Sequence, residues 1–180
     1  MPPLPQSPAA NVPSFNSSAL AVLAVMLAVA VYVELKERRI PNWLTLSGMA
    51  LGLLIAYMNH TMVSSIVGLF VGFGFLFIFY VFGGVGGGDV KLMGAAGALM
   101  GGHLIQSALV YTAFIGAFLA VMMLIWRKDF WMRIGLGFRQ LAFWRKGSAT
   151  ELEPAAPIAV PYGMAIALGC LLALLDGDAV

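Results

Sequence analysis

The stretch that decides the fold is residues 92–126, which read LMGAAGALMGGHLIQSALVYTAFIGAFLAVMMLIW. These 35 residues carry no Asp, Glu, Lys or Arg, and their clearest interruption is Gly101-Gly102-His103. One membrane crossing needs about 20 mostly apolar residues, so the stretch is too long for one crossing and slightly short for two. Its division therefore sets the number of helices and the side of the membrane on which the later loops lie.

The composition of the whole chain requires a membrane environment. Of its 180 residues, 61% are hydrophobic and only 10% are charged, and the mean hydropathy is +0.94. Soluble domains are about 45–50% apolar, so an ordinary soluble protein is excluded. A net charge of +2 is too small for a surface that neutralises phosphates. We predict an integral membrane protein with lipids, and no nucleic acid, as partners.

Loop charges decide how the long stretch is divided. Four further apolar runs lack charged residues: 17–33, 43–58, 62–82 and 158–175. Dividing 92–126 at Gly101-Gly102-His103 gives six helices, and loops 34–42, 83–91 and 127–157 then face one side. Those loops hold all 10 Lys and Arg residues, which the positive-inside rule keeps in the cytoplasm. We predict an all-α polytopic membrane protein with about six transmembrane helices and both termini outside.

The transmembrane domain is predicted over residues 19–175. A proline-rich disordered outer tail precedes it (1–18), and a short outer tail follows it (176–180). Within the cytoplasmic loop 127–157, large apolar residues recur at helical spacing beside basic ones: Trp131, Ile134, Phe138, Leu141 and Trp144. That pattern is typical of an amphipathic helix on an anionic leaflet, and the alternative is a docking surface for other proteins.

The fourth predicted helix is unusually short. At 1.5 Å per residue, residues 89–100 span only about 18 Å of a hydrocarbon core of about 30 Å. Five glycines between Gly83 and Gly88 precede Asp89 and Lys91, and an ionisable residue at membrane depth is a functional hypothesis by default. The alternative is that Asp89 only caps the helix after a flexible loop, with Lys91 reaching the membrane surface.

Glu34 is the most membrane-embedded of the other carboxylates on the same side, because it directly follows an apolar run. Its alternative role is an interfacial ion pair with Arg38 at i+4, worth about 0.2–0.5 kcal/mol on an isolated helix. Pro41 lies between Arg38 and the next apolar run, and it predicts that the first helix stops sharply before it and a new helix starts there. Glu37, one turn beyond Glu34, remains a further candidate.

Three short motifs together resemble those of a known family: Gly86-x-Gly88-Asp89-x-Lys91, Ile40-Pro41-Asn42 and Pro161-Tyr162-Gly163. The sequence is similar to the type IV prepilin leader peptidases, membrane aspartic peptidases of the G-x-G-D kind. It most resembles the short members that serve tight-adherence pilus systems and lack the N-terminal methylation module. The resemblance covers nearly the whole chain outside the N-terminal tail.

The resemblance implies two catalytic carboxyl groups. The second aspartate of the family corresponds to Asp89, and the first corresponds to Glu34, six residues before Ile40. The two carboxyl groups would share a proton, one activating water while the other polarises the scissile carbonyl, with no metal and no cofactor. Glu carries one methylene more than Asp, and a displacement of about 1 Å can cost about 10²-fold in rate, or about 2.7 kcal/mol of barrier.

The resemblance also implies a substrate and a location. The substrate would be a prepilin of the Flp type, whose cytoplasmic leader is removed at the bacterial inner membrane during pilus biogenesis. Gly86, Gly88 and Lys91 would form the loop that admits the substrate backbone, while the Ile-Pro-Asn and Pro-Tyr-Gly motifs would be structural. Other pilus-assembly proteins are possible partners. The alternative is a catalytically impaired relative that binds prepilins or scaffolds assembly. A third hypothesis, a small transporter, lacks support in the sequence.

Overall fold

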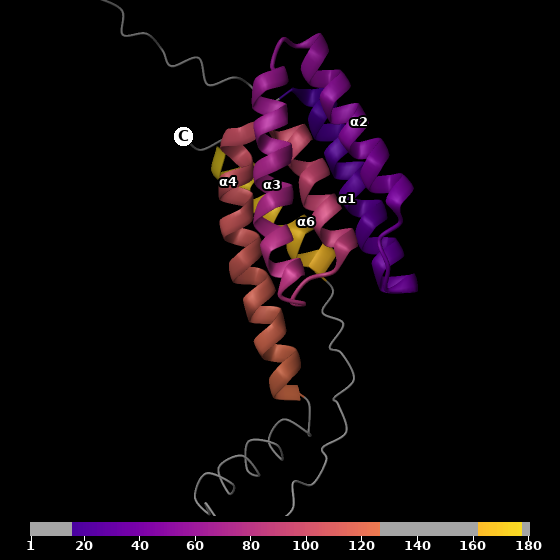
Figure 1. Ribbon diagram of the computed structural model, residues 1–180, viewed down its shortest axis with the longest axis vertical. Coiled ribbons are helices and arrows are strands. Elements are labelled where there is room, and N and C mark those ends of the chain that lie inside the picture. Colours follow the sequence, from indigo (N-terminus) through magenta and orange to yellow (C-terminus); the bar gives the residue numbers. More distant parts are fainter. Residues whose placement is uncertain (1–15, 127–161, 178–180) are drawn as a thin grey trace, which may run out of the picture.

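The computed structural model describes residues 16–126 and 162–177 (Figure 1). The amphipathic loop 127–157, Pro161 and most of the two predicted tails lie outside these residues. The described part is all-helical, with five helices: α1 (Ser17–Glu37), α2 (Asn42–Met58), α3 (Met62–Val81), α4 (Gly87–Trp126) and α6 (Tyr162–Gly177). Ser17–Glu37, Met62–Val81 and Gly87–Met123 are long and apolar enough to cross a membrane, and α2 and α6 are shorter apolar helices. The prediction of an all-α polytopic membrane protein is confirmed.

Local capping explains where α1 ends and α2 begins. Asn16 caps α1 by accepting a hydrogen bond from the Ser18 N–H at 3.0 Å, so Ser17 and Ser18 are helical rather than part of the tail. At the other end Arg38 adopts a left-handed conformation with φ 53°, and its N–H bonds to the Glu34 carbonyl. Pro41 then lies immediately before α2 in an extended conformation. The predicted stop and restart is confirmed.

The long stretch is divided at Gly101. This residue interrupts α4 with φ 77° and ψ 173°, a conformation that glycine adopts readily. A methyl group on Gly72 of α3 would lie 2.6 Å from the Met93 carbonyl oxygen and 3.3 Å from the Ile105 side chain. The two halves of α4 therefore both pack against α3 at Gly72. They can do so because the chain reverses its direction at Gly101 (Figure 1). The predicted break is confirmed, while the number of crossings and their orientation remain predictions.

Two serines of α3 stabilise this reversal. The buried Ser65 hydroxyl donates to the Ala98 carbonyl at 2.6 Å, and the Ser64 hydroxyl accepts from the Gly102 N–H at 3.1 Å. Backbone groups that a break in a helix leaves unpaired need such partners when they are buried. The sequence analysis did not assign these serines, although adjacent serines in an apolar run are a detectable signal.

The first half of α4 is the centre of the bundle. Nearly every side chain from Val90 to Met100 is buried, and the half is packed against α1, α2, α3 and α6. Small residues permit this packing, since a methyl group on Gly68 would overlap the Gly97 backbone. Gly74, on the same helix as Gly68, has nothing within 4 Å of an added methyl group. The helix begins at Gly87, two residues before its predicted start.

Candidate active site

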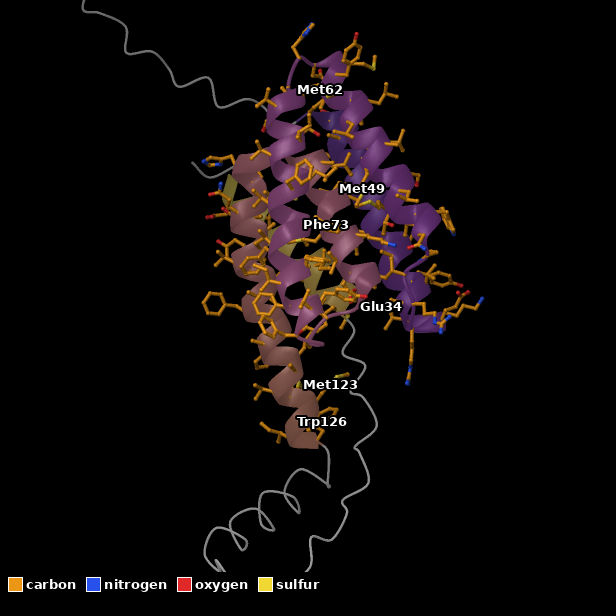
Figure 2. All side chains as sticks on the ribbon, in the orientation of Figure 1. Glu34, Met49, Met62, Phe73, Met123 and Trp126 are labelled. Atoms are coloured by element: carbon orange, nitrogen blue, oxygen red, sulfur yellow. The ribbon has the colours of Figure 1, made fainter. Side chains whose placement is uncertain are left out.

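Glu34 and Asp89 lie at the same end of the helical bundle. Glu34 is in the last turn of α1 and Asp89 in the first turn of α4, and their exposed fractions are only 9% and 8%. Figure 2 shows Glu34 at the end opposite Met62, while Trp126 lies past the end at which Glu34 is found. Two buried carboxyl groups are thus placed where α1 ends and α4 begins.

Asp89 is held by the glycine loop before it. The Gly86 carbonyl accepts the first backbone hydrogen bonds of α4, from the N–H groups of Asp89 and Val90. Asp89 Oδ2 accepts in return from the Gly86 N–H at 3.2 Å, the reciprocal pattern of a helix cap. The other oxygen, Oδ1, is buried and has no hydrogen-bond partner among the described residues. The capping alternative therefore accounts for one oxygen and leaves the other unexplained.

Glu34 is held by a backbone group far away in the sequence. Its Oε1 accepts from the Gly163 N–H, at the start of α6, at 3.2 Å. Its Oε2 is buried without a partner in the described part of the chain. Arg38, the alternative partner, bonds to Glu34 through its backbone N–H alone in that part. The structure thus gives the carboxylate a backbone donor, while the alternative ion pair with Arg38 is not formed in the described part of the chain.

Ile40 connects the surroundings of the two carboxyl groups. A methyl group on Gly163 would lie 3.5 Å from Ile40 Cδ1, and one on Gly88 would lie 3.0 Å from Ile40 Cβ. Gly163 holds Glu34, and Gly88 directly precedes Asp89. Ile40 is therefore close to the glycine that holds Glu34 and to the glycine that precedes Asp89. The Ile-Pro-Asn motif therefore lies between the two acidic residues.

A hydrogen bond also joins the motif that contains Asp89 to the Ile-Pro-Asn motif. Lys91 Nζ donates to Asn42 Oδ1 at 2.9 Å, joining the first turn of α4 to the first residue of α2. Lys91 therefore has a specific partner, which the alternative of a lysine merely reaching the membrane surface did not include. Tyr162 also lies near enough to Asp89 to experience its charge. These residues come from three helices that are not consecutive along the chain, α2, α4 and α6.

Comparison with known proteins agrees with this arrangement. The model of the type IV leader peptidase family matches residues 21–124, more than half of the chain. The chain belongs to the type IV leader peptidase family. The matched segment contains Glu34, the Ile40-Pro41-Asn42 motif and Asp89, and it ends before Gly163. No curated protein and no solved structure matches this family member.

The described residues contain no group of three or more His, Cys, Asp or Glu side chains placed to hold a metal ion. Cys170 is buried in α6 as a free thiol. The titratable groups that the described residues bring to the candidate site include the carboxyl groups of Glu34 and Asp89. Sequence reasoning identified both, and it missed the Gly163 N–H, whose part in holding Glu34 depends on contact between distant helices.

Proposed function

We propose that this family member is a membrane aspartic endopeptidase that removes the cytoplasmic leader from type IV prepilins, with Asp89 and Glu34 as its catalytic pair. The observation that carries the proposal is shared by both residues. Each carboxyl group has one oxygen fixed by a glycine N–H and a second buried oxygen that has no partner among residues 16–126 and 162–177. Buried polar atoms are normally satisfied, so two such oxygens at one end of a bundle favour a site for water and substrate.

The fixed oxygens orient the carboxyl groups, and the other two are available for chemistry. One carboxylate takes a proton from water, whose oxygen attacks the scissile carbonyl carbon. The protonated partner donates a hydrogen bond to the carbonyl oxygen and stabilises the charge that develops there. Collapse of the tetrahedral intermediate breaks the C–N bond, and the leaving amine receives a proton from the carboxyl pair.

The longer side chain at position 34 has a support that an aspartate would not reach equally well. Gly163 approaches the Glu34 carboxylate closely, because a methyl group there would lie 2.5 Å from Oε2. The Gly163 N–H also donates a hydrogen bond to Oε1 of the same carboxylate. This contact supports activity with Glu34 in place of the first aspartate.

Several further features belong to the proposal. Gly86, the residue before α4, and Gly88, in its first turn, admit the substrate backbone, and Lys91 contributes from that turn and not from a loop. The substrate is a prepilin of the Flp type, and the enzyme works as a multi-pass protein of the bacterial inner membrane, with lipids and other pilus-assembly proteins as partners. The predicted cytoplasmic orientation of its basic loops supports this substrate, because a leader would lie on the same side as the site.

A second candidate function follows from Glu34 itself. Because the family has aspartate at this position, the chain is alternatively an impaired relative that binds prepilins or scaffolds pilus assembly. In that case the Gly163 contact only preserves the fold at the end of α1. The two candidates differ in whether wild-type protein cleaves a prepilin at all.

The test is prepilin cleavage in membranes that contain the wild type, Asp89→Asn, Glu34→Gln or Glu34→Asp. Each is expressed with a candidate prepilin encoded in the same genome. We expect cleavage by the wild type and its loss in Asp89→Asn and Glu34→Gln. Cleavage by Glu34→Asp alone would contradict the proposal and support the impaired relative.

A further inference from the structure

An apolar cavity of about 150 Å³ lies beside the carboxyl pair. It lies between the C-terminal half of α3, the second half of α4 and the first residue of α6, and it is open on one side, because its wall residues Phe75, Phe79, Ala113 and Ala117 are exposed. Its lining includes Phe75, Phe79, Val85, Ala113, Ala117 and Tyr162. The sequence analysis did not predict this cavity, because its walls come together only after α4 reverses at Gly101.

Two lining residues connect the cavity to the catalytic groups. Val85 belongs to the glycine loop and lies next to Gly86, whose N–H holds Asp89. Tyr162 lies next to Gly163, whose N–H holds Glu34. The cavity therefore begins one residue away from each of the two backbone donors that orient the carboxyl groups.

The size and the chemistry of the cavity limit what it can hold. A protein cavity of about 150 Å³ lined by aliphatic and aromatic groups binds one benzene molecule. That volume fits one large apolar side chain. Ala113 and Ala117 lie on one face of α4, four residues apart, and their small side chains leave this space.

We propose that this cavity is a substrate subsite that receives one large apolar side chain of the peptide, a few residues from the scissile bond. The inference rests on the proposed peptidase function and deepens it. A side chain seated here holds the peptide backbone beside the glycine loop and the two carboxyl groups. Specificity for a bulky apolar residue at one position of the substrate follows, because only that residue fills the cavity.

The first test narrows the cavity with Ala117→Leu. Ala50→Leu is the matched control, since Ala50 is an exposed alanine of α2 outside the cavity. Both variants are assayed with a prepilin and with derivatives in which each large apolar residue near the cleavage point is changed to alanine, one at a time. Ala117→Leu is expected to slow cleavage of the parent substrate by roughly 10- to 200-fold, the range for crowding a hydrophobic specificity pocket.

One substrate derivative is expected to remove that penalty, so that Ala117→Leu and the wild type cleave it at rates within about threefold. Ala50→Leu is expected to cleave every substrate as the wild type does. An equal penalty on all substrates would overturn the inference, because it is the result expected if the cavity holds lipid or only supports the fold. The absence of any penalty on the parent substrate would overturn it as well.

A second measurement does not depend on cleavage. Ala117→Cys is combined with Asp89→Asn, to keep the substrate intact, and with Cys170→Ala, to remove the native thiol. Disulfide cross-linking is then measured against prepilins that carry one cysteine at successive positions. Cross-linking at one position or two adjacent positions supports the subsite, and uniform or absent cross-linking overturns it. If the wild type cleaves no substrate, the proposed function fails while this measurement still decides the inference.

Discussion

Gly163→Ala tests how tightly the site positions Glu34. The added methyl group would lie 2.5 Å from Glu34 Oε2 and 3.2 Å from its Cδ, whereas ordinary van der Waals contact begins at 3.4 Å. The carboxylate must therefore move by about 0.9 Å. A misplacement of about 1 Å costs roughly 10²-fold in rate, or about 2.7 kcal/mol of barrier. We expect kcat/KM for prepilin cleavage to fall by that factor.

Gly74→Ala is the matched control. It introduces the same methyl group into another membrane helix, at a glycine with nothing within 4 Å, so we expect wild-type activity. The assay is cleavage of a purified prepilin by purified enzyme in detergent micelles, with thermal unfolding measured on the same samples. If the two variants have equal melting temperatures, a loss of activity in Gly163→Ala is due to the displaced carboxylate and not to a damaged fold.

A second substitution tests the cause of the loss. Glu34→Asp withdraws the carboxylate from Gly163 by one methylene, which makes room for the added methyl group. In that background Gly163→Ala is expected to have little further effect, so the two changes are strongly non-additive. If Gly163→Ala leaves kcat/KM within about twofold of the wild type, the reasoning is refuted, because the contact would not position a catalytic group.

Three further predictions concern the framework of the site. Ser65→Ala is expected to lower the free energy of unfolding by about 1–3 kcal/mol, because the buried Ala98 carbonyl loses its partner beside the reversal of α4. Gly68→Ala is expected to cost at least about 1–3 kcal/mol, because the methyl group would meet the backbone of α4 rather than a side chain that can move. Lys91→Met and Asn42→Ala are expected to lower the melting temperature by equal amounts, since both remove one hydrogen bond, and the double variant is expected to lose no more than either single one.

These predictions are checked by thermal unfolding in one detergent. Ser47→Ala is the control for Ser65→Ala, since the Ser47 hydroxyl bonds to a carbonyl of its own helix. A neutral Ser65→Ala would show that the reversal does not need this hydroxyl. Additive losses for Lys91 and Asn42 would show that their contact contributes nothing to stability.

The sequence predicted those features that depend on neighbouring residues. Pro41 marked the restart of the helix, and the charge-free stretch of 35 residues required a division, which the Gly101-Gly102-His103 interruption located and the loop charges supported. The glycine loop before Asp89 located the start of the short helix to within two residues. In each case a local preference or a count of charges was sufficient.

Features that depend on contact between distant helices were not predicted. The hydrogen bond from Gly163 to Glu34 joins residues 129 positions apart. The bond between Lys91 and Asn42 similarly depends on how α2 lies against α4. No periodicity or motif carries such information, because it depends on which faces of the helices pack together. The ion pair considered for Glu34 was a local alternative, and the packing of α6 replaced it.

The central claim is that Glu34 and Asp89 act together on one substrate. The most direct measurement is kcat/KM for prepilin cleavage by the wild type, Glu34→Gln, Asp89→Asn and the double variant. We expect each single substitution to lower kcat/KM by roughly 10²- to 10⁴-fold and the double variant to be no worse than the poorer single one. A Glu34→Gln enzyme that cleaves at the wild-type rate, or two losses that multiply, would contradict the claim.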